Sequence, residues 1–261
     1  MARRPLAIFT IAQEEPETLP KWLAHYSKHV GPHDLYVLHH GLVAGGEPWL
    51  DAAVAPYPGV RVVEVDAEYC FDHAWIGETV ALFRQFLLQS YEWTLFSDAD
   101  ELLAPMPDVE ANLVDHTRRL SAACFVTVRC RGYEVIHQAD EPPLRLDEPW
   151  LTQRSWWAQS HFYSKSLLSR VPIRHGLGFH NLVGDFVAPF DRLALVHLKK
   201  VDVDLALTRH RRYASRDWCP QDVADGIGRH QRIVDPERLR RYFDHAIGPL
   251  EPMPDWVRSL A

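Results

Sequence analysis

Short apolar runs alternate with amphipathic stretches through the first hundred residues of the chain. The runs are rich in β-branched and aromatic side chains, which favours buried strands, and they lie at residues 6–11, 35–38, 60–65 and 93–96. Two intervening stretches repeat apolar residues at helical spacing, with Leu19, Leu23, Tyr26 and Val30 in the first and Ile76, Val80, Phe83 and Leu87 in the second. Alternating strands and helices predict crossover connections, so we expect an α/β fold with a mainly parallel central sheet flanked by helices.

The pattern is less regular after Asp100. It still predicts strands at 124–129, 161–164 and 193–198 and helices at 108–120, 203–213 and 236–246. Residues 138–158 contain paired prolines and paired tryptophans, and we expect them to form a loop along the rim of a pocket. Because no internal repeat or clear linker interrupts the sequence, we expect residues 1–261 to form a single domain with a helical, basic C-terminal part from about residue 202.

Composition excludes several classes of protein. A formal net charge of -7 argues against a general nucleic-acid binder. No apolar run reaches the roughly 20 residues that span a bilayer, and the apolar start of the chain is interpreted as a first strand rather than a signal peptide. The four cysteines lack metal-ligand spacing and fit a reducing compartment, so a cytoplasmic location is expected; they are Cys70, Cys124, Cys130 and Cys219.

The strand predicted at 93–96 stops at three acids, Asp98, Asp100 and Glu101. Unpaired carboxylates are too costly to bury, so these acids should lie at the carboxyl edge of the sheet, where open α/β folds bind their ligands. Two carboxylates one residue apart can share Mn²⁺ or Mg²⁺, which in turn binds phosphate groups. A phosphatase of the haloacid dehalogenase type is a competing interpretation, but its motif follows the first strand, whereas here the acids follow the fourth.

Four parts of the sequence carry a family resemblance, in order along the chain. They are Ile8–Glu15 with Leu19–Leu23, Phe96–Leu102, Tyr163–Arg170 with Gly178–His180, and Leu195–Lys200. Together they resemble glycosyltransferases of the GT-A fold, in the family 2-like and family 92-like group. The chain departs from the group at Gln13, where the opening turn usually has Asn, and at His39-His40-Gly41, which replaces an Asp-Asn-x-Ser turn.

The resemblance implies a nucleoside diphosphate sugar as donor, with a UDP-sugar first among them. Its motifs place Gln13, Glu14, Asp98 and Lys165 among the donor-binding residues, and Asp98 and Asp100 at the metal. Relatives also place an arginine at the position of Arg84, where a guanidinium can clamp phosphate, although a solvated helix residue is an equal alternative.

Histidines are candidates for completing the metal shell. The resemblance implies a late ligand at His197, which ends a predicted strand, and His180 is the rival; a purely structural role is the alternative for either. From its position at the end of the third strand, Asp66 is a further donor-binding candidate for the base or ribose.

An inverting transferase requires a base to take the proton of the acceptor hydroxyl, whereas a retaining one does not. Glu148 and Asp185 are the candidate catalytic residues, and Glu148 comes first because it lies next to Pro149-Trp150 and near two more tryptophans on which a sugar can stack. Asp140, Glu141 and Asp147 are also in range.

Residues 209–241 hold an excess of arginine. They are expected either to form a solvated helical face or to contact anionic headgroups or a lipid diphosphate acceptor at the inner face of a membrane, without inserting.

Taken together, the expected reaction is metal-dependent transfer of a sugar from a nucleoside diphosphate to a hydroxyl of a saccharide or lipid-linked acceptor. Two alternatives are a sugar-nucleotide nucleotidyltransferase, whose glycine- and lysine-rich phosphate loop is missing here, and a non-catalytic carbohydrate-binding protein of the same fold.

Overall fold

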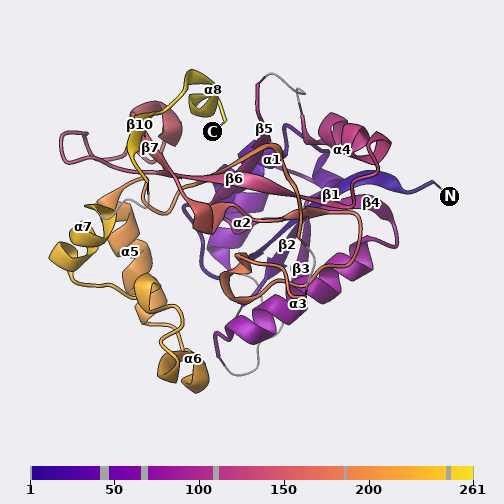
Figure 1. The fold of residues 1–261 in the computed structure, drawn as a ribbon. Helices are drawn as coiled ribbons and strands as arrows, with labels where there is room; N and C mark the ends of the chain where they lie inside the picture. The colour runs from indigo at the N-terminus through magenta and orange to yellow at the C-terminus, as the bar shows by residue number, and fades with distance from the viewer. Residues whose placement is uncertain are drawn as a thin grey trace.

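The computed structural model describes residues 2–41, 47–65, 70–107, 112–184, 187–244 and 248–260. Within these residues, ten strands join into one sheet with helices on both of its faces (Figure 1). The fold is therefore a mixed α/β arrangement around a central sheet, as the sequence pattern predicts.

The first part of the sheet is parallel and follows the expected crossovers. Its strands lie in the order β3-β2-β1-β4, and the register places Ala12 beside His39 and Phe9 beside Phe96. The strands are β1 (Arg4–Ala12), β2 (Leu35–His39), β3 (Arg61–Glu64) and β4 (Tyr91–Phe96), and the helices between them are α1 (Leu19–Tyr26), α2 (Pro48–Val54) and α3 (His73–Leu87). The four predicted strands and two predicted helices of this part are confirmed.

The remaining strands correct the expectation of a mainly parallel sheet. They are β5 (Glu101–Pro105), β6 (Thr127–Val135), β7 (Trp156–Gln159), β8 (Leu168–Ser169), β9 (Phe190–His197) and β10 (Leu250–Pro252). Among them β6 and β9 run parallel, whereas β8 is antiparallel to β4 and β6, β7 to β6 and β10, and β5 to β9. The part of the sheet built from helical crossovers is thus wholly parallel, whereas the later strands pair in both directions.

Three local predictions after Asp100 are wrong. Strand β5 was not expected; its residues are all buried, so it shows no alternation of polar and apolar side chains. Strand β7 lies inside the predicted 138–158 loop, and the predicted strand at 161–164 is a 3-10 turn, η3 (His161–Tyr163). In that turn the Ser164 amide bonds to the His161 carbonyl at 3.2 Å, a local bond that replaces a sheet ladder.

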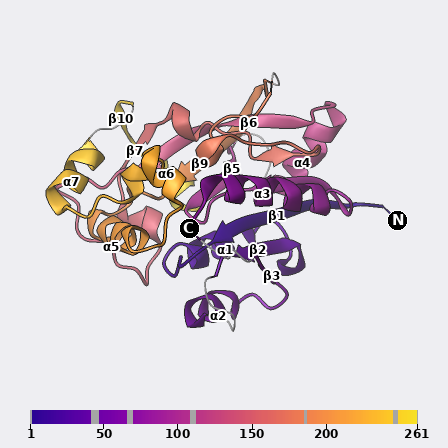
Figure 2. The same ribbon diagram turned by 90° about the horizontal axis from the view of Figure 1, so that it is seen from below.

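The helices of the second half form two groups. Helix α4 (Leu113–Ala122) covers the sheet near β1, whereas α5 (Val203–Ala214), α6 (Pro220–Ala224) and α7 (Pro236–Asp244) lie together at the opposite side of the molecule (Figures 1 and 2). The predicted helices are confirmed at 113–120, 203–213 and 236–244, and residues 108–111 and 245–246 lie outside the described residues. The remaining short elements are η1 (Pro32–Asp34), η2 (Trp150–Gln153), η4 (Leu177–Phe179), η5 (Arg229–Gln231) and α8 (Asp255–Arg258).

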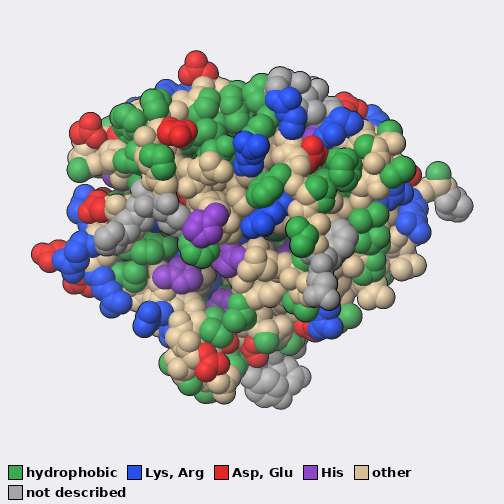
Figure 3. Space-filling model, in the orientation of Figure 1, with side chains coloured by type: hydrophobic (Ala, Val, Ile, Leu, Met, Phe, Trp, Pro, Cys, Tyr) green, Lys and Arg blue, Asp and Glu red, His purple; other side chains and the backbone are tan. Residues whose placement is uncertain are grey.

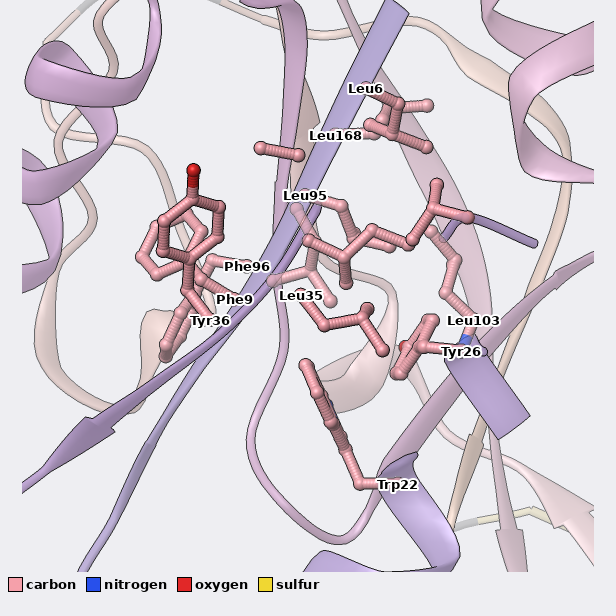
Figure 4. Close-up of a cluster of buried hydrophobic side chains, with 14 of the residues drawn as sticks. Leu6, Phe9, Trp22, Tyr26, Leu35, Tyr36, Leu95, Phe96, Leu103 and Leu168 are labelled. Carbon is pink, nitrogen blue, oxygen red and sulfur yellow. The ribbon is translucent and has the colours of Figure 1, made fainter. Parts of the chain in front are cut away.

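The core fixes the end of β4. Phe9 and Phe96 pack with their ring centroids 5.3 Å apart, and Trp22 and Tyr26 reach the sheet from α1 (Figure 4). Trp22 Nε1 donates to Ser97 Oγ at 2.9 Å, and Ser97 Oγ donates to the Tyr26 hydroxyl at 3.0 Å. Ser97 immediately precedes Asp98, so these bonds hold the acidic turn in place from within the core.

Candidate functional site

One pocket lies at the carboxyl edge of the parallel strands. Its volume is about 410 Å³, and the residues that follow β1, β2 and β4 contribute to its wall together with the start of α3, the η4 segment, the end of β9 and α5. Figure 3 shows histidine side chains gathered around a hollow on this face. The histidines that line the pocket are His40, His73, His180, His197, His210 and His230. This is the position at which open α/β sheets bind ligands.

The acidic turn after β4 forms part of the pocket floor. The Glu101 amide bonds to the Asp98 carbonyl at 3.0 Å, and the Leu198 amide bonds to the Asp100 carbonyl at 2.8 Å. The Asp98 side chain is 36% exposed and that of Asp100 is 12% exposed. The two carboxylates therefore differ: Asp98 meets solvent, and Asp100 is enclosed by protein.

Lys165 neutralises the negative charge on one side of this turn. Its Nζ lies 2.5 Å from Glu101 Oε1 and 3.3 Å from Asp98 Oδ2. Burial alone would lower the pKa of Lys165, but the carboxylates of Glu101 and Asp98 raise it, so the side chain stays charged. The prediction that Lys165 belongs to the site is consistent with its position in the pocket wall.

Arg209 neutralises the negative charge on the other side of the turn. Its Nη2 donates to Asp100 Oδ2 at 2.8 Å and lies 3.3 Å from Glu15 Oε2, while the Tyr213 hydroxyl donates to Glu15 Oε1 at 2.5 Å. Burial would raise the pKa of Asp100, but Arg209 and His197 hold it well below its usual range. The acids after β1 and β4 are thus joined through one guanidinium from α5.

His197 lies between two carboxylates. Its Nε2 is 3.6 Å from Asp100 Oδ1, its Nδ1 is 3.6 Å from Glu134 Oε1, and Tyr163 stacks on its ring with centroids 3.9 Å apart. Burial would lower the pKa of His197, but Asp100 and Glu134 raise it above its usual value. Glu134 lies on β6 directly beside His197 in the sheet register, which explains the contact.

A divalent metal was expected here, so the donor set was compared with what a metal requires. Among the described residues, no group of three or more His, Cys, Asp or Glu side chains is placed to hold a metal ion. Asp98 and Asp100 are hard oxygen donors of the right kind, but each already faces a protein cation, and His180 is bonded through Nδ1 to the Phe162 carbonyl at 2.7 Å. Metal binding stays a prediction.

Lys199 differs from the other cations of the pocket wall. It is 8% exposed and lies over the Tyr242 ring at 5.6 Å, and no carboxylate of the described residues lies within ion-pair distance of it. Burial lowers the pKa of Lys199 to about 8, although Asp100 and Glu134 act in the opposite direction. A buried ammonium without a close acid is well suited to an anionic ligand.

The end of the pocket near β2 is flat and aromatic. His40 packs on Trp75 with ring centroids 5.0 Å apart and on Phe71 at 5.9 Å. Burial and the nearby Arg216 lower the pKa of His40 to about 4, so its ring is neutral. His40 Nε2 and Gln13 Oε1 are buried without a hydrogen-bond partner among the described residues, and both residues line the pocket. Unsatisfied polar atoms beside aromatic rings suit a planar ligand with polar edges.

The sequence-predicted residues differ in where the structure places them. The structure brings Gln13, Asp98, Asp100, Lys165, His180 and His197 together in the pocket wall. Glu14 adjoins the pocket at a left-handed backbone position, φ 52°, with its carboxylate 3.8 Å from Arg216 Nε. Asp66 and Asp185 lie outside the described residues.

The positions of Arg84 and Glu148 contradict their predicted roles in binding the donor and in catalysis. Arg84 is fully buried in the core, where it donates to the Thr94 carbonyl at 3.3 Å and to the Leu167 carbonyl at 3.1 Å, so it does not reach a ligand. The helix face that carries it packs on β4 rather than toward the pocket. Glu148 is paired with Arg145 at 2.5 Å, near Lys21 on α1, and is not part of the pocket wall. The 138–158 loop therefore does not bring this acid to the acidic turn.

Several pocket residues were not identified from the sequence. Glu134 gives no signal beyond its residue type, whereas Glu15 and Lys199 lie inside segments that carry the family resemblance without being singled out by it. Arg209 and Arg216 belong to the basic 209–241 stretch, which had been interpreted as an outward face. Arg209 pairs with Asp100, Arg212 with Glu17 at 2.6 Å, and Arg216 donates to the Gln13 carbonyl, so these three arginines turn inward.

Comparison with known proteins gives little further information. No family model and no curated protein matches the sequence. Among solved structures, the crystal structure of S. aureus TarS 1-349 is similar with a TM-score of 0.38 and 9% sequence identity, over 92% of this chain and 72% of that one. At this score the likeness carries no argument, so function is argued from the residues of the site. Across the described part of the chain, every helix is too short or too polar to cross a membrane.

Proposed function

We propose that the protein transfers a sugar from a nucleoside diphosphate sugar to an acceptor hydroxyl, in the manner of a GT-A glycosyltransferase. One observation carries the proposal: an Asp-x-Asp turn at the end of a buried parallel strand shares a pocket with Lys165, Lys199 and Arg209. Acids of this kind can bind a metal and cations of this kind can bind a diphosphate, and both lie at the ligand edge of the sheet.

The diphosphate would lie between the acidic turn and Lys199. Lys165 and Arg209 already neutralise Glu101, Asp98, Asp100 and Glu15, so Lys199 supplies the positive charge that is not matched at close range. In this position the ammonium stabilises the negative charge that grows on the leaving diphosphate.

Mn²⁺ or Mg²⁺ is part of the proposal, with Asp98 and Asp100 as its carboxylate ligands and His197 or His180 as a further one. When bound, such an ion would polarise the diphosphate leaving group. Asp98 is the accessible entry point, because its side chain is the more exposed of the two. Arg209 already pairs with Asp100, so a bound ion would draw on a carboxylate that this guanidinium also neutralises.

The nucleoside would occupy the aromatic end of the pocket. A base stacked near His40 and Phe71 would place its polar edge beside Gln13 Oε1 and His40 Nε2, which otherwise lack partners. Gln13 Oε1 accepts a hydrogen bond, so the base must offer an N–H there, as the imide group of uracil does. The other nucleobases carry N–H donors as well, so the UDP-sugar that we favour as donor rests on the family resemblance and is compatible with this end of the pocket.

The acceptor would be a saccharide or a lipid-linked hydroxyl. The exposed arginines of 209–241 would make peripheral contact with anionic headgroups at a cytoplasmic membrane face; they are Arg211, Arg229, Arg238, Arg240 and Arg241.

Direct calorimetric titration tests the proposal. UDP and inorganic pyrophosphate would be titrated into the protein with Mn²⁺ and with a chelator. Binding of UDP that weakens at least tenfold in Asp98→Asn, a variant of the more exposed acid, supports the proposal. Equal binding to wild type and Asp98→Asn would contradict it.

A further inference from the structure

Two of the four cysteines lie side by side at the edge of the pocket wall. Cys70 precedes Phe71 and the Asp72 cap of α3, and Cys219 precedes α6. Both are free thiols with intermediate exposure. Along the chain they are far apart, so only the fold brings them together.

The backbone holds the two segments in register. The Phe71 amide bonds to the Asp217 carbonyl at 2.6 Å and the Cys219 amide bonds to the Phe71 carbonyl at 3.0 Å, which makes a parallel bridge between Phe71 and Trp218. Successive side chains of extended backbone alternate between faces. Phe71 and Trp218 therefore pack together on one face, with centroids 4.8 Å apart, and Cys70 and Cys219 both fall on the other.

The side chains on that second face meet. Cys70 and Cys219 lie diagonally across the bridge, and burial, the neighbouring Cys219 and the carboxylates of Asp72 and Asp217 together raise the pKa of Cys70. A further link, from His73 Nδ1 to Asp222 Oδ2 at 2.8 Å, joins the start of α3 to α6 beside the thiols. Two thiols on the same face of two segments that backbone hydrogen bonds hold together are placed so that a small adjustment can bring the sulfurs to bonding distance.

We propose that Cys70 and Cys219 form a reversible intramolecular disulfide that cross-links the two sides of the pocket wall. With a small-molecule disulfide such as oxidised glutathione as oxidant, one thiolate attacks the glutathione disulfide, releases one glutathione thiol and leaves a mixed disulfide. The second cysteine thiolate then attacks this mixed disulfide at the protein sulfur and releases the second glutathione thiol. Two protein thiols are oxidised, one glutathione disulfide is reduced, and the two thiol protons leave with the glutathione products.

The cross-link would act on the ligand pocket. Phe71 and His73 line the pocket from the α3 side, and residues 226–231, which follow α6, line it from the other. In the reduced protein these sides are joined by noncovalent contacts, including the Phe71–Trp218 ring packing, whereas the disulfide ties them covalently and closes a long loop of the chain. The oxidised protein is therefore expected to hold this wall more rigidly. The inference does not depend on the proposed transferase activity.

The remaining thiols serve as controls. Cys124 is exposed, and Cys130 is buried with its Sγ 3.1 Å from the Lys165 carbonyl. The full-length chain would carry Cys124→Ser, to exclude disulfides between molecules, and would be incubated with oxidised glutathione in mildly alkaline buffer, because the raised pKa of Cys70 slows exchange near neutrality. Peptides would then be mapped by mass spectrometry without reduction. Matched samples would carry Cys70→Ser or Cys219→Ser in addition.

The proposal predicts a linked peptide pair containing Cys70 and Cys219 in most chains, its loss on reduction, and a melting temperature at least about 3 °C higher in the oxidised form. Each serine variant should instead carry one glutathione on the remaining cysteine. Stable glutathione adducts on both cysteines of the folded protein, with no linked peptide, would overturn the proposal. So would a linked peptide that forms only in urea.

Discussion

Arg209 Nη2 lies 2.8 Å from Asp100 Oδ2, on a carboxylate whose other oxygen faces His197 Nε2 at 3.6 Å. Asp100 is thus held negative by Arg209 with His197 beside it, whereas Asp98 two residues earlier is 36% exposed. The two acids of this Asp-x-Asp motif therefore lie in different environments: Asp100 is enclosed and paired, and Asp98 is partly exposed. Asp100 contributes to the folded structure as well as to the site, and Asp98 is the better place to test function alone.

Neutralising each acid should separate these roles. Asp100→Asn removes a buried partner of Arg209 but leaves Glu15, so we expect the free energy of unfolding to fall by about 1–3 kcal/mol. Asp98→Asn removes a partly exposed charge and should cost less than about 1 kcal/mol. Urea denaturation followed by circular dichroism measures both. Equal losses would show that the burial of Asp100 has no energetic consequence.

The adjacent lysines of the β9–α5 connection provide a matched pair. Lys199 lies in the pocket wall with no acid of the described residues at ion-pair distance, whereas Lys200 Nζ faces Glu134 Oε2 at 3.6 Å. We expect Lys199→Met to weaken pyrophosphate binding about tenfold or more, which corresponds to the loss of one charged contact. Lys200→Met should instead lower stability, because Glu134 loses a buried partner, and should change pyrophosphate affinity less than threefold. Isothermal titration of pyrophosphate into both variants makes the comparison, and the reverse order of effects would refute the assignment of Lys199.

Stability should depend on pH through buried histidines. Burial lowers the pKa of His25 to about 4 and that of His210 to about 3, from an ordinary value of 6.5. The unfolded chain therefore binds more protons than the folded one below pH 6.5, so stability is complete above that pH and is lost as the pH falls toward 4. Each histidine should contribute a loss of up to about 1.4 kcal/mol per pH unit in this window.

Urea denaturation at several pH values between 7 and 5 measures this slope. His25→Asn removes one titrating group. The slope of the unfolding free energy against pH should therefore decrease by the amount that corresponds to about one bound proton. A slope that is unchanged in this variant would mean that His25 is already protonated in the folded protein, with both ring nitrogens donating to the carbonyls of Leu103 and Leu260.

A glycine on β6 controls the position of Tyr163. A Cβ on Gly132 would overlap the carbonyl carbon of Tyr163, so Gly132→Ala must displace the η3 turn and the ring that stacks on His197. We expect a loss of about 1–3 kcal/mol in stability together with weaker nucleotide binding. Gly77→Ala is the control, because nothing lies within 4 Å of its Cβ and alanine favours a helix. If both variants were as stable as the wild type, the close approach of Tyr163 to β6 would be refuted.

The sequence predicts the first half of the fold better than the second. Up to Phe96, short apolar runs typical of strands alternate with stretches whose apolar residues have helical spacing. Each element predicted from this pattern is present. After Asp100 the strands are joined by short or irregular segments, and β5 is buried on both faces, so neither periodicity nor strand direction is visible in the sequence.

Some residues of the site can likewise be predicted from the sequence, and others cannot. Asp98 and Asp100 could be found because an apolar strand ends at them. Arg209 could not, because an inward-facing arginine and a solvated one look alike until the partner carboxylates, Asp100 and Glu15, are placed beside it. Arg84 shows the opposite error: a helical arginine beside the acidic strand suggested a ligand contact, yet its three hydrogen bonds all stay within the core.

Thermal shift with a panel of nucleoside diphosphate sugars, each with and without Mn²⁺, tests the proposed transfer function most directly. We predict that at least one UDP-sugar raises the melting temperature in a metal-dependent way, and that Asp98→Asn and Lys199→Met abolish the rise while folding normally. The absence of any shift in the wild type, with every sugar nucleotide and under every metal condition, would contradict the assignment of this pocket to a sugar donor.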